Sequence, residues 1–218
     1  MTPARPPGRL ALAATLAALC AAPAARAEAG PIPVALARRD GHVVAAVDLT
    51  AVLPGELPSR LGNGLRNVVA LYVAVVPIGG EEPTAAFVRV FDVLFDVWEE
   101  TWTVTVRDPR TPGGRRHVLR SVDALRALLA RVDEADLGPA GSLPPSRFTV
   151  DVRIDVNPIS PELLAATREY LAGAAGGRGA SRSVLGAVAG FLLREPEERE
   201  QSLVFRSRPL SPDAVPPR

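Results

Sequence analysis

The chain has 218 residues, of which 47% are hydrophobic and 22% are charged, with a formal net charge of +1. This composition favours one globular domain and excludes a disordered polyelectrolyte. All 25 basic residues are arginines, so the chain has no lysine for a Walker A phosphate loop, a Schiff base or a serine–lysine dyad.

Residues 1–27 have the pattern of a secretory signal peptide. Arg5 and Arg9 precede an apolar run, and Ala25-Arg26-Ala27 fits the small-residue cleavage pattern. The run from residue 10 to residue 22 is shorter than the roughly 20 residues of a membrane span. We therefore expect cleavage after this motif and export to the periplasm or the extracellular space. A retained anchor and lipidation at Cys20 are the alternatives.

Cleavage would change the charge and the redox chemistry of the chain. The signal contains three of the arginines and no acid, so 22 arginines face 24 acids in the mature chain, a net charge of −2. This balance gives no basic footprint for nucleic acid. The single cysteine leaves with the signal, so we expect no disulfide in the mature protein.

The first half of the mature chain predicts strands with one short helix. Residues 32–53 alternate around Asp40-Gly41, which predicts a hairpin because glycine accepts a positive φ. Prolines and glycines break the pattern over residues 54–63 and allow at most a short helix around residues 56–61. The apolar, β-branched run over residues 68–76 predicts a strand that is covered on both faces.

Residues 86–107 predict one long extended segment with an interruption. Its apolar side chains occupy odd positions up to residue 97 and even positions from residue 98. Such a switch predicts a β-bulge or a sharp corner near Glu99-Glu100. A short return strand is expected over residues 117–120.

A helix is expected to follow over residues 122–135, capped by Ser121. Residues 147–156 alternate so regularly that they predict a half-buried strand with a charged, solvated outer face. Further helices are expected over residues 161–172 and 183–193; the second lies either in the core or on a membrane surface. Residues 203–205 predict a closing strand.

These elements together predict an α+β fold, a curved, mainly antiparallel sheet of about six strands with two or three helices packed on one face. We expect a single exported globular domain over residues 28–207 and a disordered, proline-rich tail over residues 208–218. The predicted core includes Phe95, Leu125, Leu128, Val150, Val152, Ile154 and Leu164.

The order of these elements resembles a bacterial family of exported proteins that is known only as domain of unknown function 4390. The export signal, the hairpin at Arg39-Asp40-Gly41-His42, the aromatic strand 91–102, the helix 121–132 and the strand 147–156 carry the resemblance, over roughly residues 32–207. The Gly-rich break at 173–179 departs from the family. The resemblance implies an exported envelope protein and carries over no catalytic residue.

The sequence offers little for catalysis. His42 and His117 are the only histidines, they lie far apart in the sequence, and no Gly-x-Ser-x-Gly motif is present. We therefore predict no catalytic residue, no metal site and no cofactor. Asp92, Asp96 and Glu100 share a parity and leave a carboxylate-based hydrolytic groove as an alternative to a solvated face.

A binding surface is predicted at Trp98, together with Asp96 and Glu100. A bulge near residues 99 and 100 would turn Trp102 toward the phenylalanines of the core and leave Trp98 partly exposed. Tryptophan is enriched at binding hot spots. The competing interpretation is that Trp98 packs under a helix on the other face of the sheet.

The predicted function is that of a non-enzymatic, exported envelope module that acts through protein contacts, with an envelope protein as its partner. The first alternative is a carrier that holds a lipid or another apolar ligand between sheet and helices, and the second is a hydrolase that uses Asp or Glu residues. We expect no nucleic-acid partner and no transmembrane span in the mature chain.

Overall fold

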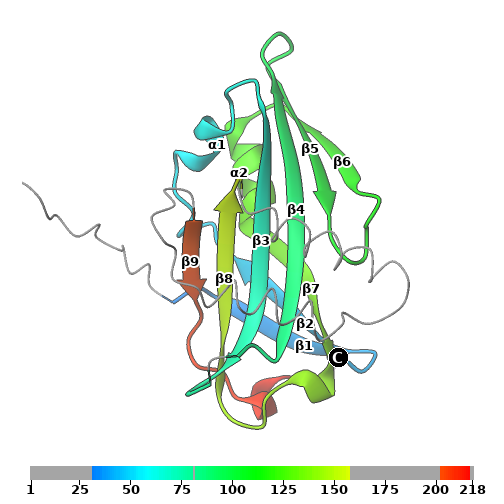
Figure 1. Ribbon diagram of the computed structural model, residues 1–218, viewed down its shortest axis with the longest axis vertical. Helices are drawn as coiled ribbons and strands as arrows, with labels where there is room; N and C mark the ends of the chain where they lie inside the picture. Colours follow the sequence, from blue (N-terminus) through cyan, green and yellow to red (C-terminus); the bar gives the residue numbers. More distant parts are fainter. Residues whose placement is uncertain (1–30, 81, 158–201, 217–218) are drawn as a thin grey trace, which may run out of the picture.

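The computed structural model describes residues 31–80, 82–157 and 202–216, which form two antiparallel sheets and two α-helices (Figure 1). In this part of the chain the strands are β1 (Val34–Arg39), β2 (His42–Asp48), β3 (Arg66–Pro77), β4 (Ala85–Asp96), β5 (Thr101–Arg107), β6 (Arg115–Leu119), β7 (Arg131–Pro139), β8 (Phe148–Val156) and β9 (Ser202–Arg206). The helices are α1 (Leu57–Arg60) and α2 (Val122–Ala130), and short 3-10 turns lie at η1 (Ala140–Ser142) and η2 (Pro212–Ala214).

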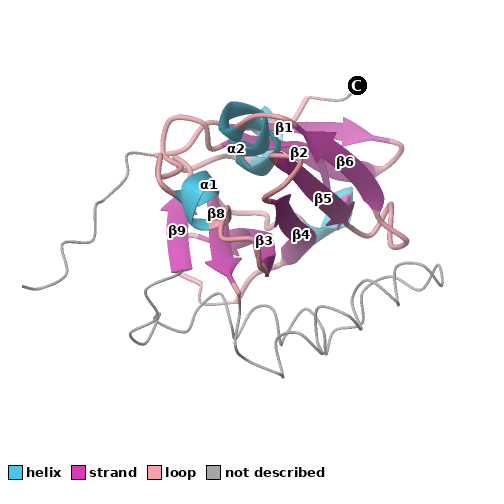
Figure 2. Cartoon of the chain, turned by 90° about the horizontal axis from the view of Figure 1, so that it is seen from above, coloured by secondary structure: helices cyan, strands magenta, loops and turns pink. Residues whose placement is uncertain are grey.

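The larger sheet has six strands in the order β6-β5-β4-β3-β8-β9, and the smaller has the order β1-β2-β7. Every neighbouring pair in both sheets is antiparallel. Viewed from above, α2 and the strands β1 and β2 lie on the same side of the larger sheet (Figure 2). The prediction of a mainly antiparallel, sheet-rich fold with a few helices is confirmed.

The core lies between the larger sheet and the layer formed by α2 and the smaller sheet. Of the predicted core residues, Val150, Val152, Ile154 and Leu125 are buried, whereas Phe95 and Leu128 are only partly buried. Leu164 lies outside the described residues. Burying these aliphatic and aromatic side chains supplies the main driving force for folding.

The predicted hairpin is present, and so is the short helix for which the sequence leaves room. Asp40 and Gly41 connect β1 to β2 with φ values of 51° and 79°, the positive pair that a two-residue turn between right-twisted strands requires. Residues 57–60 form α1. The sequence predicts this turn because few residue pairs tolerate two successive positive φ angles.

The helix expected over residues 122–135 is shorter than predicted. Ser121 caps it as expected, since its Oγ accepts a hydrogen bond from the backbone N–H of Ala124 at 3.1 Å. The helix ends at Ala130, and residues 131–139 form β7 instead. Val132 satisfies both a helical stripe and a strand alternation, and pairing with β2 decides in favour of the strand.

The segment 86–107 is a hairpin and not one interrupted strand. β4 and β5 pair along their lengths, from Val90 opposite Arg107 to Asp96 opposite Thr101. A four-residue turn at 97–100 reverses the chain, and this reversal explains the change in parity. The alternative of a sharp corner was therefore nearer to the structure than a bulge.

The prediction that β8 has a solvated, charged face is wrong. Asp151, Arg153 and Asp155 are buried on that face, and β8 is an inner strand between β3 and β9. Hydrogen bonds offset the cost of burying these charges. Asp151 accepts from both Nε and Nη2 of Arg206, at 3.0 and 2.7 Å, and Asp155 accepts from Arg153 Nε at 3.0 Å.

The tail expected to be disordered is in contact with the domain over residues 208–216. Leu210 forms a bridge with Phe148, Val215 is buried, and the carbonyl oxygen of Pro216 accepts a hydrogen bond from the N–H of Arg38 at 3.0 Å. Proline has no backbone N–H group, so a proline-rich segment can pack irregularly without leaving a buried donor unpaired.

The predicted signal over residues 1–27 and the predicted helices 161–172 and 183–193 lie outside the described residues. Among the described helices, none has the length and apolar character to span a membrane.

Candidate binding surface

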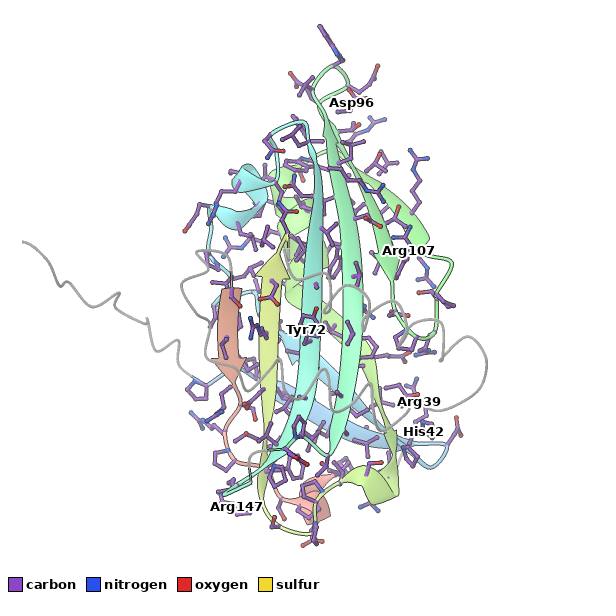
Figure 3. The ribbon with its side chains drawn as sticks, in the orientation of Figure 1. Arg39, His42, Tyr72, Asp96, Arg107 and Arg147 are labelled. Atoms are coloured by element: carbon purple, nitrogen blue, oxygen red, sulfur yellow. The ribbon has the colours of Figure 1, made fainter. Side chains whose placement is uncertain are left out.

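Trp98 stands at the end of the molecule, in the turn between β4 and β5. Its side chain is 91% exposed, and the neighbouring Asp96 marks the same end in Figure 3. The interpretation that Trp98 packs beneath a helix is therefore wrong, and its predicted exposure is confirmed. A fully exposed tryptophan is unusual because its side chain has a large apolar surface.

The turn that presents Trp98 has a defined backbone. Oδ1 of Asp96 accepts hydrogen bonds from the N–H groups of Trp98 and Glu99, at 2.9 and 3.1 Å. Glu100 closes the turn with a φ of 50°. All three residues predicted as a binding surface thus lie in or beside one turn, where Asp96 orders the backbone.

The turn end of this hairpin is anchored in the core. Trp102 is 4% exposed and packs on Phe95, with ring centroids 4.5 Å apart. Its ring also lies directly against Gly62. Trp102 therefore lies in the core, whereas Trp98 lies in solvent. The buried ring of Trp102 holds β5 in place directly after the turn that presents Trp98.

The loop before β3 lies beside the turn and adds apolar surface to it. Val97 Cγ1 is 3.3 Å from the position that a Cβ on Gly64 would take. The buried Asn67 holds this loop, because its Nδ2 donates to the carbonyl oxygens of Leu61 and Leu65 at 3.2 and 3.0 Å.

We call the exposed apolar residues at this end the tip surface: Leu65, Leu94, Val97 and Trp98. Leu94 is the cross-strand partner of Arg66, which places it beside the loop that contains Leu65. Sequence reasoning missed all of them except Trp98. Leu94 could have been found, since it lies at an even position between inward-facing odd ones, whereas nothing local marks Leu65.

The charge around the tip surface is negative. Asp96, Glu99 and Glu100 are exposed, and within the described part of the chain none of them forms an ion pair. The nearest acid along β4, Asp92, is already neutralised by Arg66 and Arg107. The turn therefore combines an exposed aromatic ring with three carboxylates that have no ion-pair partner among the described residues.

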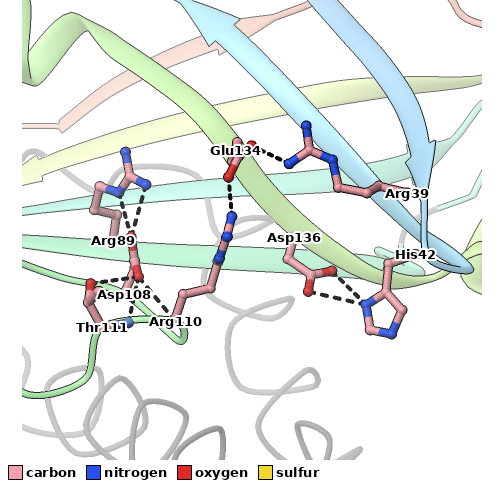
Figure 4. Close-up of polar contacts among 8 residues, drawn as sticks. All are labelled: Arg39, His42, Arg89, Asp108, Arg110, Thr111, Glu134 and Asp136. Atoms are coloured by element: carbon pink, nitrogen blue, oxygen red, sulfur yellow. Dashed lines mark hydrogen bonds and ion pairs between the residues drawn. The ribbon is translucent and has the colours of Figure 1, made fainter. Parts of the chain in front are cut away.

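A second polar cluster lies at the other end of β5 (Figure 4). Burial raises the pKa of Asp108, whereas hydrogen bonds from Thr111 and the positive charge of Arg89 lower it. The lowering effects are together the larger, so the pKa lies below its ordinary value. Glu134 on β7 binds both Arg110 and Arg39, which lower its pKa. These contacts fasten the β5–β6 loop to both sheets and have an evident structural role.

His42 has a partner that its sequence context did not reveal. Its Nδ1 lies 2.9 and 3.1 Å from the two carboxylate oxygens of Asp136 on β7. In the described ranges no hydroxyl bonds to the other ring nitrogen, as a serine-type catalytic triad would require. The described residues also contain no group of three or more potential metal ligands.

No protein-family model matches the chain, and neither the curated proteins nor the solved structures contain a match.

Proposed function

We propose that this protein is an exported, non-enzymatic module that binds a partner protein through the tip surface. The single observation that carries the proposal is Trp98, which is 91% exposed on a turn whose backbone is ordered by Asp96. Ordering the turn before binding reduces the entropy lost on association. Export and the resemblance to domain of unknown function 4390 stay predictions. The curvature of the sheet and the packing of two or three helices on one of its faces also stay predictions.

The size of the tryptophan side chain makes it a suitable anchor. Burying it in a partner's pocket removes about 150–250 Å² from water and yields about 4–6 kcal/mol of gross stabilisation before the costs of association. Leu94 and Val97 extend the apolar area around it. A central aromatic anchor with smaller apolar neighbours is the usual composition of a hot spot.

The charges favour a protein partner over a membrane. Asp96, Glu99 and Glu100 would be repelled by anionic headgroups, whereas a basic rim around an apolar pocket would complement them. The carrier alternative receives less support, because core side chains of the larger sheet and α2, such as Phe91, Leu125 and Leu129, are buried together in one hydrophobic cluster.

Site-specific photo-crosslinking in the source cell tests this proposal. A photoreactive residue at position 98 should give one discrete protein adduct, and the same residue at the exposed position 147 should not. The adduct should disappear in the Glu99→Lys/Glu100→Lys variant. Identical adducts from both positions, or an adduct that survives charge reversal, would contradict the proposal.

Binding measurements with the identified partner then test the anchor. Trp98→Ala should weaken binding by about 30-fold, the effect of a hot-spot residue worth about 2 kcal/mol, and Trp98→Phe should weaken it less. Vesicles of phosphatidylcholine with phosphatidylglycerol provide the control. A blue shift of Trp98 fluorescence on these vesicles, without any protein adduct, would favour a membrane instead.

A further inference from the structure

We propose that the open edge of β6 accepts an acidic, extended segment of a partner protein by strand addition. β6 is the terminal strand of the six-stranded sheet, so alternate N–H and C=O groups of its backbone point away from β5. Such an edge is the template on which an extended peptide adds a strand.

Two other edge strands, β9 and β1, form backbone hydrogen bonds on their outer sides. The N–H of Ile32 donates to the carbonyl oxygen of Arg206 on β9 at 3.0 Å, and the N–H of Arg38 on β1 donates to Pro216 at 3.0 Å. Within the described residues no such backbone contact reaches the outer side of β6. The described segments thus cover parts of two edges and leave the β6 edge open.

Arginines line this open edge. Arg115, Arg116 and Arg120 are exposed, and in the described part of the chain they form no ion pair or side-chain hydrogen bond. No acid occurs between Asp108 and Asp123 in the sequence. The segment therefore concentrates positive charge in a chain whose acids and bases otherwise balance.

The charge selects the occupant. A second copy of β6 would bring two sets of exposed arginines together at one edge, and the repulsion between these like charges disfavours it. An added strand with Glu or Asp opposite Arg115 and Arg116 would form favourable cross-strand pairs instead. Val118, which is 59% exposed, offers a place for a β-branched side chain of the partner.

The edge is also held in place before any partner binds. Asp108 accepts hydrogen bonds from the N–H groups of Arg110 and Thr111, at 3.1 and 3.0 Å, and so orders the loop that leads into β6. Arg110 binds Glu134 on the other sheet. On the far side, Ser121 caps α2 directly after β6. A template fixed at both ends loses little freedom when a strand is added.

This edge uses other residues than the tip surface, so its test is independent of the proposed function. The probe is a capped ten-residue peptide in which Glu residues flank alternating Thr and Val, added to the full chain labelled with ¹⁵N. We expect saturable binding that weakens with salt, with amide shifts concentrated in residues 115–120. Shifts centred elsewhere would overturn the proposal.

Charge reversal provides the matched variants. Arg115→Glu/Arg116→Glu should weaken peptide binding by roughly tenfold, since several attractive pairs become repulsive. Arg147→Glu/Arg208→Glu changes the net charge equally at exposed positions outside β6 and should leave binding unchanged. Equal losses in both variants would show that net charge alone attracts the peptide and would overturn the proposal.

Backbone pairing is tested separately from charge. The same peptide with N-methyl groups on every central residue keeps its carboxylates but loses the N–H donors of both edges, so it should not bind. Undiminished binding of the methylated peptide would overturn strand addition. A twelve-base-pair DNA duplex that competes better than the peptide would identify a general polyanion site and overturn the proposal as well.

Discussion

Trp102 lies so close to Gly62 that the two residues leave no room for a side chain between them. A Cβ on Gly62 would stand 2.8 Å from Cη2 of the indole ring and 3.2 Å from the carbonyl oxygen of Ser59. The glycine therefore lets the loop before β3 approach the turn end of the β4–β5 hairpin. This contact joins the two segments that form the tip surface.

Gly62→Ala should destabilise the fold by about 1–3 kcal/mol, because the added methyl group must displace a buried ring. Urea denaturation of the purified chain measures the change. Gly113→Ala is the matched control, since a Cβ there meets nothing within 4 Å. Equal stabilities of the two variants would contradict the packing described for Trp102.

Two single-tryptophan variants should report opposite environments. In Trp102→Phe only Trp98 emits, and its fluorescence should be red-shifted and strongly quenched by acrylamide because the side chain is 91% exposed. In Trp98→Phe only the buried Trp102 emits, and its fluorescence should be blue-shifted and protected. Protected emission from Trp98 would remove it as a contact residue.

Helix α2 offers a comparison between adjacent leucines. Leu129 is fully buried in the core, whereas Leu128 is only partly buried. Leu129→Ala should therefore cost about 2–5 kcal/mol, and Leu128→Ala clearly less. A thermal or urea denaturation series measures both, and the reverse order would mean that the apolar face of α2 is rotated.

Asp108 should make stability depend on pH in the acid range. Its folded pKa lies below the ordinary value of 3.8, so its ionised form stabilises the fold above that pH, and this contribution is lost as the pH falls through the folded pKa. Asp108→Asn should cost about 1–3 kcal/mol at neutral pH. The difference from the wild type should narrow below about pH 4.

A second variant identifies the source of this effect. Thr111→Val removes one hydroxyl donor, which lies 2.9 Å from Oδ1 of Asp108, and leaves the carboxylate in place. It should cost less than Asp108→Asn and keep most of the acid dependence. A pH-independent gap between Asp108→Asn and the wild type would show that the carboxylate is not ionised preferentially in the folded state.

Local chemistry made part of the fold predictable. The Asp40-Gly41 turn, the Ser121 cap and the buried strand β3 follow from residue types that have few alternatives. The end of α2 was not predictable in this way. Val132 and Leu137 suit either a helix or a strand, and only pairing with β2, about 90 residues away, decides between them.

The same limit applies to the candidate site. The change in parity near Glu99-Glu100 indicates an irregularity beside Trp98. It does not predict that the chain reverses completely there. The charged face of β8 was misjudged because alternation reveals which side chains share a face and not what faces them. Asp151 and Asp155 find partners on β9, about 50 residues further on.

The last strand has a consequence for the order of folding. β3 to β6 follow one another through short turns, whereas Ser202 on β9 meets Asp155 on β8 across 47 positions. Closing a longer loop costs more entropy, and such non-local pairing forms slowly. Phe205 on β9 belongs to the core. The core therefore cannot be completed before β9 has been synthesised and has paired with β8.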